Sequence, residues 1–520
     1  MLVKCYASAL QGIGASTVTI EVDISQGINF FLVGLPDSAV KESQRRIESA
    51  LKASGFELTK KRVVINMAPA NLRKEGSAYD LPLAIGILAA SGVITSERLP
   101  EYVLMGELSL DGNLERVKGV LSMAIHAREQ GFRGIILPVQ NAPEAGVIDG
   151  IEVYGMDNIS QVVSFLEGEP GFQPVSPEDS FDFMTDQVDF GVDFSEVKGQ
   201  SNVKRALEIA ASGGHNILLI GPPGSGKTML ARRLPTILPP LSPEESIETT
   251  KIYSAAGKLN NNGSLVSSRP FRDPHHTISD TALVGGGAYP QPGEISLAHN
   301  GVLFMDELPE FKRNVLEVLR QPMEGRTMTI SRAKFTVKYP ASFMLVASMN
   351  PCPCGYYNHP DRECECPPGA VQKYLSRISG PLLDRIDIHI EVTPVPFHDL
   401  SENPSQPLSN LGIIESSSDI HKRVISARQI QLERYHENQE VHCNAQLTAS
   451  LMVRHCQPEA AGSALLKTAM EKLDLSARAY DRILKVSRTI ADLDAAENIQ
   501  PQHLAEAINY RSLDRKAWGG

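Results

Sequence analysis

A glycine-rich run between an apolar stretch and a helix-forming stretch is the strongest chemical signal in the sequence. It occupies residues 221–228 (GPPGSGKT), after the predicted strand 216–220 (NILLI) and before residues 229–234 (MLARRL). Glycines let consecutive backbone N–H groups point at phosphate oxygens, and the helix N-terminus adds partial positive charge. The pattern predicts a phosphate-binding loop in which Lys227 reaches the β and γ phosphates and Thr228 holds Mg²⁺. The predicted nucleotide contacts are Gly221, Pro222, Pro223, Gly224, Ser225, Gly226, Lys227 and Thr228.

Two adjacent carboxylates, Asp306 and Glu307, end a second apolar run at residues 301–308 (GVLFMDEL). A strand with a solvated acidic end is common, but downstream of a phosphate loop the pair favours metal and water chemistry. We expect Asp306 to help hold Mg²⁺, and Glu307 to orient and deprotonate the attacking water. A third apolar run, 343–349, ends at Asn350. Alone, an Asn before a Pro is usually a turn residue, but beside these motifs it can hold the water or the γ-phosphate.

Four of the seven cysteines form two close pairs, Cys352-x-Cys354 and Cys364-x-Cys366, with His359 between them. Two pairs of thiolates flanked by Pro and Gly suit a tetrahedral structural Zn²⁺. The C-x-C spacing is tighter than the usual zinc-binding spacing, so four reduced thiols in a loop is the other interpretation. His359 is an alternative ligand.

The composition indicates a globular protein with several domains. A chain of 520 residues with 42% hydrophobic and 21% charged residues is neither fibrous nor wholly disordered. Its apolar runs are too short to span a membrane, its N-terminus lacks signal-peptide features, and seven cysteines do not make a secreted disulfide framework. We therefore expect a cytoplasmic protein with no membrane partner.

The formal net charge of −11 argues against a protein that coats nucleic acid through bulk positive charge. However, residues 167–196 hold nine acidic residues and no Lys or Arg. This stretch carries most of the excess, and we interpret it as an interdomain linker. The remainder is nearly neutral, so a local basic groove is compatible with the composition.

The secondary-structure pattern predicts three parts that position these residues. Residues 1–166 are expected to form an α+β domain, and residues 197–395, where β and α segments alternate, a parallel sheet flanked by helices. Residues 396–420 are predicted to be a second linker, and residues 421–520 have helical spacing. In the first domain we expect strands at 16–24, 29–35, 62–67 and near 102–109, a last strand at 134–137, and helices at 37–54, 79–90 and 121–130.

Several longer motifs resemble those of the YifB/ComM family of magnesium-chelatase-like AAA+ ATPases. They include PHHTISDTALVGGG, PGEISLAHNGVLFMDELPEF, LRQPMEGR and ASMNPCPCG. The resemblance covers essentially the whole chain. It implies an α/β AAA+ P-loop core, an N-terminal ribosomal-S5-like domain of the kind also found in Lon-type peptidases, and a C-terminal helical lid.

The resemblance also implies roles for individual residues. Lys227 and Thr228 match the Walker A motif, Asp306 and Glu307 the Walker B motif, and Asn350 sensor 1. Arg385 (LLDRID) takes the arginine-finger position, with Arg377 (YLSRIS) as a rival, and Arg478 (LSARAYDR) takes sensor 2. An arginine finger that reaches a neighbouring subunit's ATP implies a ring, and relatives of this type suggest a homohexamer.

The branch is associated with branch migration of DNA during uptake and recombination, so the resemblance implies DNA as partner. The insert around Pro274-His275-His276 and Gly285-Gly286-Gly287 resembles a pore-facing insert of this clade. A hairpin is predicted over 326–339 (RTMTISRAKFTVKY), where four basic residues could line a channel and contact phosphates. They are Arg326, Arg332, Lys334 and Lys338. Solvated strand residues and a turn-capping His pair are the alternative.

Other functions remain open. A metal-insertion subunit and a protein-remodelling or regulatory ATPase are the alternatives, although chelatase motor subunits lack the S5-like domain. A Lon-type peptidase needs a Ser–Lys dyad. Ser77 lacks the surrounding glycine pattern and Lys118 is out of register, so we expect no peptidase dyad.

Overall fold

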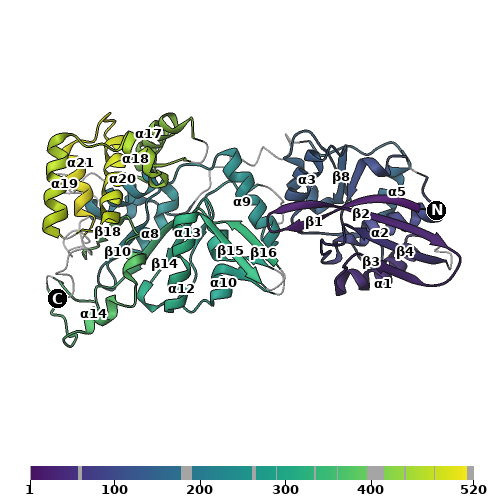
Figure 1. The fold of residues 1–520 in the computed structure, drawn as a ribbon, viewed down its shortest axis with the longest axis horizontal. Helices are drawn as coiled ribbons and strands as arrows, with labels where there is room; N and C mark the ends of the chain where they lie inside the picture. The colour runs from purple at the N-terminus through teal and green to yellow at the C-terminus, as the bar shows by residue number, and fades with distance from the viewer. Residues whose placement is uncertain are drawn as a thin grey trace, which may run out of the picture.

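The computed structural model describes residues 2–56, 61–95, 97–176, 190–259, 265–287, 290–332, 335–359, 361–394, 415–438, 441–473 and 475–511. The molecule is elongated, with the N-terminal sheet at one end, a second sheet in the middle and the C-terminal helices at the other end (Figure 1). None of its described helices has the length and apolar character needed to cross a bilayer.

A mixed seven-stranded sheet forms the N-terminal part, in the order β3-β4-β2-β1-β5-β8-β9. Its strands are β1 (Leu2–Gln11), β2 (Gly14–Ser25), β3 (Phe30–Val33), β4 (Arg62–Ala68), β5 (Tyr102–Leu104), β8 (Gly134–Pro138) and β9 (Glu152–Met156), and a separate small hairpin pairs β6 (Glu107–Leu108) with β7 (Leu114–Glu115). The expectation that the last strand lies at 134–137 is wrong, because β9 follows and pairs with β8 in parallel. The first strand, β1, was also not expected.

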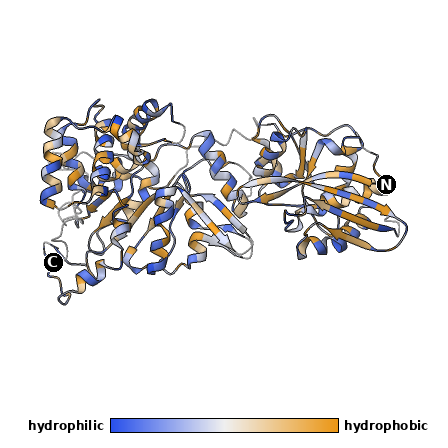
Figure 2. Cartoon of the chain, in the orientation of Figure 1, coloured by the Kyte–Doolittle hydropathy of each residue, from blue (hydrophilic) through white to orange (hydrophobic). Residues whose placement is uncertain are grey.

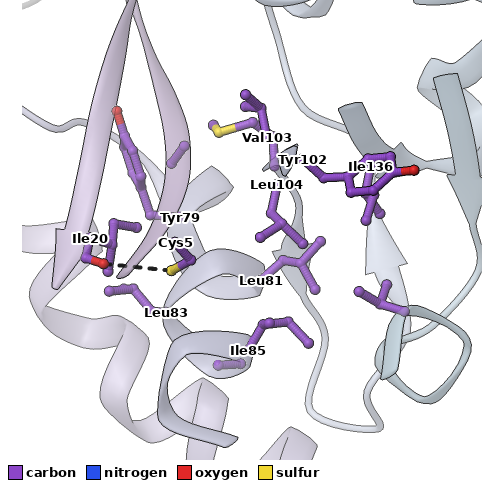
Figure 3. Packing of buried hydrophobic residues seen from close by; sticks show 14 of the residues in the cluster. Cys5, Ile20, Tyr79, Leu81, Leu83, Ile85, Tyr102, Val103, Leu104 and Ile136 are labelled. Atoms are coloured by element: carbon purple, nitrogen blue, oxygen red, sulfur yellow. Dashed lines mark hydrogen bonds between the residues drawn. The ribbon is translucent and has the colours of Figure 1, made fainter. Parts of the chain in front are cut away.

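Helices pack on this sheet because the contact removes the apolar side chains of both from water. They are α1 (Ser38–Ala53), α2 (Asp80–Ser91), α3 (Val120–Glu129), α4 (Ala142–Gly146) and α5 (Ile159–Leu166). Asp37 begins α1 by accepting a hydrogen bond from the backbone N–H of Val40 at 2.8 Å, as an N-cap residue does. Figure 3 shows α2 residues such as Leu81 packed beside Cys5, whose thiol donates to the carbonyl of Ile20.

The middle part is a five-stranded parallel sheet in the order β11-β14-β17-β10-β18. Its strands are β10 (Ile217–Ile220), β11 (Phe271–Arg272), β14 (Val302–Met305), β17 (Met344–Met349) and β18 (Ile388–Glu391). All residues of β10, β14 and β17 are buried, as expected for a parallel sheet covered on both faces. Hydrophobic residues accordingly concentrate along the strands in Figure 2. Because β14, β17 and β10 are parallel neighbours, their carboxyl ends meet at one edge of the sheet.

Short helices and two hairpins surround this sheet. The helices are α7 (Ser201–Gly213), α8 (Lys227–Arg233), α9 (Pro243–Ala256), α10 (Asp280–Val284), α11 (Glu294–Leu297), α12 (Arg313–Val318), α13 (Arg320–Gly325), α14 (Ala370–Leu375) and α15 (Gly380–Leu383). The insert hairpin pairs β12 (Gly285–Gly286) with β13 (Gln291–Pro292), and the basic hairpin pairs β15 (Thr327–Arg332) with β16 (Phe335–Pro340).

The C-terminal part consists of helices, as expected. They are α17 (Ser417–Tyr435), α18 (Ala449–His455), α19 (Ala460–Leu473), α20 (Ala477–Leu493) and α21 (Pro501–Asn509). They share one hydrophobic core with the sheet, because Ile483 and Leu504 belong to the same buried cluster as Ile217. A buried ion pair between Asp387 and Arg482, 2.9 Å long, also joins the two parts. The expected fold class is thus confirmed, while the exact domain limits stay predictions.

The N-terminal part docks on α9 and on the basic hairpin. Leu121, Val147 and Ile148 pack with Leu265 in a small apolar cluster. Beside it, the hydroxyl of Ser254 on α9 donates to the buried carboxyl of Glu144. Burial raises the pKa of Glu144.

The tip of the β1–β2 turn meets the basic hairpin, where a β-carbon on Gly12 would lie 2.6 Å from Cγ1 of Val337. The Val337 side chain of the basic hairpin therefore packs directly against the backbone of the β1–β2 turn.

Candidate nucleotide site and cysteine cluster

The predicted phosphate loop leaves the end of β10 and enters α8, as the sequence indicates. Gly226, the residue before α8, has φ of 90°, a left-handed conformation that favours glycine. The Gln200 side-chain amide donates to the carbonyls of Ser225 and Thr393, at 2.9 and 3.2 Å. Gln200 therefore joins the phosphate loop to the segment that follows β18.

Lys227 is the buried cation of the site, with 8% of its surface exposed. Its Nζ donates to the carbonyls of Gly221 and Pro222 at 2.8 and 2.9 Å, and to Oδ1 of Asn350 at 3.2 Å. Burial lowers the pKa of Lys227, whereas the carboxylates of Asp306 and Glu307 raise it. The structure thus brings Lys227 and Asn350 together although they are far apart in the sequence.

Thr228 and Asp306 meet at the same place. The Thr228 hydroxyl donates to Oδ2 of Asp306 at 2.7 Å, and the Ser348 hydroxyl donates to Oδ1. A hydroxyl and a carboxylate in contact at the foot of a phosphate loop are the hard oxygen donors that Mg²⁺ prefers. The residues therefore fit a magnesium ion that is shared with a bound phosphate.

Glu307 has an unusual backbone conformation, with φ of 55° and ψ of 49°. This left-handed region is uncommon for a residue with a side chain and carries strain that often marks functional sites. Its carboxylate is 57% exposed and lies 3.6 Å from Nδ1 of His276. Glu307 and Asn350 also line one surface pocket, together with Glu310, Pro353, Tyr374 and Arg377.

His276 was not expected here, because the sequence placed it in a pore-facing insert. The contact arises because β11 pairs in parallel with β14, so the residues that follow both strands leave at the same edge. His276 follows β11, and β11 neighbours the strand that ends at Asp306 and Glu307. This position is the sequence signal that could have predicted the contact.

The arginines occupy two separate places. Arg377 pairs with Glu310 at 2.8 Å beside Glu307 of its own chain. Arg385 is buried, donates to the carbonyl of Pro381 and pairs with Glu324 at 2.5 Å. Arg478 is 58% exposed and lies 3.5 Å from Asp384. Arg385 and Arg478 are therefore near each other, whereas Arg377 lines its own chain's site.

The four predicted cysteines converge. The sulfur atoms of Cys352, Cys354, Cys364 and Cys366 all lie within 4.8 Å of one another. Three of the separations are 3.2, 3.7 and 3.6 Å, close to the roughly 3.8 Å that a tetrahedral Zn–S length of about 2.3 Å requires. His359 is not part of this group, and its Nδ1 accepts a bond from the backbone N–H of Asp361.

The cysteine loop also supports the phosphate loop. Cys352 follows Asn350 by two residues and is fully buried. A β-carbon on Gly355 would lie 2.5 Å from Cδ of Pro223, so the two loops are in close contact. Cross-linking the four thiols through one ion would therefore fix a wall of the nucleotide site.

The other residues considered in the sequence, Ser77, Lys118 and those of the basic hairpin, lie outside the nucleotide site. Ser77 donates to the carboxylate of Glu107, while Lys118 lies against Gly257 at the end of α9, so the structure gives each a different partner. In the basic hairpin, Lys338 is exposed and Arg326 ends α13. Lys334 lies outside the described residues.

The chain is similar to known proteins over its whole length. The family described as "Magnesium chelatase, subunit ChlI" matches residues 193–400, with related matches at 20–141 and 414–511. It is 44% identical over 518 residues to "Uncharacterized protein YifB" of Salmonella typhimurium and 44% identical over 515 residues to "Competence protein ComM" of Haemophilus influenzae, in both cases covering 98% of this chain and 97% of the relative. A "Magnesium-chelatase 67 kDa subunit" of Heliobacterium mobile is 28% identical over 191 residues, which are 31% of this chain and 28% of that protein.

The parallel sheet, the phosphate loop and these matches define a magnesium-chelatase-like AAA+ ATPase. Within that class, the full-length similarity shows that the chain belongs to the YifB/ComM family.

The first prediction tests the division of work between Lys227 and Glu307. Lys227→Ala should weaken ATP binding, because it removes a charge-assisted contact. Glu307→Gln should bind ATP normally but hydrolyse it about 10²-fold or more slowly, the usual contribution of a general base. Equilibrium binding of labelled ATP and phosphate release measure the two effects. Glu471→Gln, an exposed change on α19, is the control, and equal hydrolysis by Glu307→Gln and wild type would refute the assignment.

Proposed function

We propose that this protein hydrolyses ATP as a homohexameric ring and uses the energy to move branched DNA, in the cytoplasm, during recombination of incoming DNA. The observation that carries the proposal is the convergence of Lys227, Thr228, Asp306, Glu307 and Asn350 at one sheet edge. The same domain bears the basic hairpin, on which Lys338 is exposed, and a full-length relative is named a competence protein.

The proposed chemistry follows from the positions of these side chains. When bound, ATP supplies the γ-phosphoryl group, and Mg²⁺ neutralises the charge that develops on its oxygens. Lys227 would exchange its hydrogen bonds to the Gly221 and Pro222 carbonyls for bonds to phosphate oxygens, and Thr228 and Asp306 would hold the magnesium ion. Glu307, exposed beside Asn350, takes the proton of the attacking water, which the Asn350 amide orients.

The proposal of a site shared between subunits depends on the arginine-finger position of Arg385. Arg377 lies against its own chain's Glu307 pocket, so it is less suited to reach a neighbour. Arg385 is buried against Glu324 and Pro381, whereas the exposed Arg478 contacts Asp384, the residue that precedes Arg385 in the chain. We assign Arg385 to the neighbouring subunit's ATP, which requires its guanidinium to exchange the ion pair with Glu324 for phosphate oxygens, and Arg478 to sensor 2. Cations that approach from several directions stabilise the transferring group.

DNA is proposed to bind through phosphates on the basic hairpin. Lys338 is exposed on β16 opposite Thr329, and alternation along the hairpin points Met328 and Ile330 into the protein. A ring would place one such hairpin from each subunit around a common axis, which gathers positive charge despite the negative chain.

A chelatase-type ATPase is the second candidate, favoured by the similarity of part of the chain to a magnesium-chelatase subunit. It predicts ATP turnover that is indifferent to DNA, and so does a protein-remodelling ATPase. The response to DNA therefore separates the candidates.

We further propose that the four cysteines hold a structural zinc ion. Four thiols within 4.8 Å of one another have the donor set and spacing of a closed tetrahedral site. The ion would fix the loop that carries Asn350 and contacts Pro223.

Metal analysis tests the zinc proposal. Protein purified without chelators should contain about one zinc per chain, and Cys364→Ser should lose it and bind ATP more weakly because the loop behind Pro223 relaxes. Cys443→Ala, a buried cysteine outside the cluster, should retain the metal. Absence of zinc from the wild type, measured by mass spectrometry, would contradict the proposal.

Mixed rings test the shared site. Arg385→Ala and Lys227→Ala should each lose activity, but mixed rings should recover part of it. At equal random mixing about a quarter of interfaces join an intact loop to an intact finger. Lys227→Ala mixed with Glu307→Gln is the control, because both defects lie in the same half of a site and no interface regains both residues. No recovery at any ratio would contradict the shared geometry.

Salt dependence tests the DNA proposal. Affinity for DNA should fall steeply with salt, and Lys338→Ala should reduce the slope by about one without dependence on base sequence, as loss of a phosphate contact does. Basal ATP hydrolysis should persist. Lys467→Ala, an exposed lysine of α19, is the matched control. Binding and ATPase rates that ignore DNA even at low salt would favour the alternative candidates.

A further inference from the structure

We propose that a cavity at the amino-terminal edge of the five-stranded sheet binds a phosphate dianion, which joins the C-terminal helices to the base of the basic hairpin. Free phosphate and the phosphate group of a small phosphorylated metabolite share this chemistry. The proposed site is separate from the nucleotide site, and its test depends neither on ATP hydrolysis nor on DNA.

The cavity lies at the edge of the sheet opposite the phosphate loop. It has a volume of about 110 Å³, and its lining includes Asn216, Gly301 and Asp387, which directly precede strands β10, β14 and β18. The phosphate loop and Asp306 instead follow the other ends of β10 and β14. Since a cavity of about 150 Å³ accommodates a benzene molecule, the volume is sufficient for the smaller phosphate ion.

Positive charge exceeds negative charge around this cavity. Its charged lining groups are the arginines Arg269, Arg326, Arg428 and Arg482 and the carboxylates Glu245 and Asp387. Glu245 pairs with Arg269 at 2.7 Å. Asp387 pairs with Arg482 at 2.9 Å. Four arginines less two carboxylates leave two positive charges, which match a phosphate group that carries about −1.5 to −2 charges at neutral pH.

Arg428 on α17 is the arginine whose charge is least compensated by the protein. Its Nη2 donates to the carbonyl of Ala211 at 2.9 Å, and its Nη1 donates to the carbonyl of His442 at 3.3 Å. Its buried Nε has no hydrogen-bond partner, and among the residues that the structure describes no carboxylate pairs with this guanidinium. Burial accordingly lowers the pKa of Arg428. Because carbonyls alone do not offset the cost of burying a charge, a bound anion would stabilise this side chain.

The surroundings of Lys485 on α20 are a second sign of positive potential. Its Nζ donates at 3.1 Å to the carbonyl of Ala445, which lines the cavity. Burial, with the added effect of Arg482 and Arg326, lowers the pKa of Lys485 to about 8. Asp387 opposes this shift. Like charges around one cavity repel one another, and a dianion among them would remove this repulsion.

The arginines reach the cavity from three different parts of the fold. Arg428 comes from α17, Arg482 from α20, and Arg326 from the junction of α13 and β15. Arg326 has φ of 50°, a left-handed conformation that is uncommon for a residue with a side chain, and its carbonyl accepts a hydrogen bond from the N–H of Ala341 at the base of the basic hairpin. Guanidinium groups bind phosphate oxygens in a fixed fork geometry. A phosphate held by all three would therefore tie α17 and α20 to the hairpin base.

Thermal unfolding and amide hydrogen exchange of the full-length protein test the proposal. A non-hydrolysable ATP analogue and Mg²⁺ fill the nucleotide site, so that added phosphate does not bind there. Inorganic phosphate should then raise the unfolding midpoint, because a ligand that binds only the folded state stabilises it, whereas potassium chloride at equal ionic strength should not. Hydrogen exchange should slow at residues 441–446 and 482–486 beside the cavity. Glycerol phosphate forms a separate arm: protection by both compounds indicates a site for phosphate monoesters, and protection by inorganic phosphate alone indicates a site for the free ion.

Two substitutions assign the effect to the cavity. Arg428→Gln and Arg326→Gln should each weaken phosphate binding about tenfold or more, because each removes a charge-assisted contact. Arg454→Gln, an exposed change on α18, is the matched control and should respond as wild type does. The response to phosphate is compared within each variant, so a general loss of stability does not imitate loss of the site.

Arg326→Gln keeps the test decisive if Arg428→Gln does not fold. No response of the wild type to millimolar phosphate would overturn the proposal. So would an equal response in wild type and in the cavity variants, or slower exchange confined to segments away from the cavity.

Discussion

The parallel pairing of β14, β17 and β10 is the constraint on which the rest of the structure depends. It places the ends of three buried strands at one edge, so that Lys227 donates to Asn350 while Thr228 donates to Asp306. The cost of burying the lysine ammonium is offset by two loop carbonyls, the Asn350 amide oxygen and nearby carboxylates. The neighbouring loops pack around this group of polar side chains and contact the hairpins on the outside of the sheet.

These connections suggest how chemistry at one edge reaches distant parts. The cysteine loop joins Asn350 to the phosphate loop, and the insert joins His276 to the basic hairpin. The N-terminal part contacts the basic hairpin at Gly12. It also contacts α9, where Ser254 donates a hydrogen bond to Glu144. The basic hairpin is therefore in contact with both the insert and the N-terminal part.

The sequence predicted what depends on local spacing and missed what depends on distant contacts. The phosphate loop and α1 carry their signals within a few residues, as Gly226 and Asp37 illustrate. The first strand was missed because its buried positions, Cys5, Ala7 and Ala9, are small and give no hydrophobic alternation. The contact between His276 and Glu307 was not predicted because it depends on which strands are neighbours in the sheet. The burial of Arg385 was not predicted because its partner, Glu324, is distant in the sequence.

The most direct test of the central claim is migration of a fluorescently labelled four-way DNA junction, followed in real time. Wild type with ATP should convert the junction into two duplexes, while Glu307→Gln should bind the junction and leave it intact, because the claim requires hydrolysis to drive movement. Conversion at equal rates by both proteins, or ATP consumption by the wild type with an unchanged junction, would contradict the account.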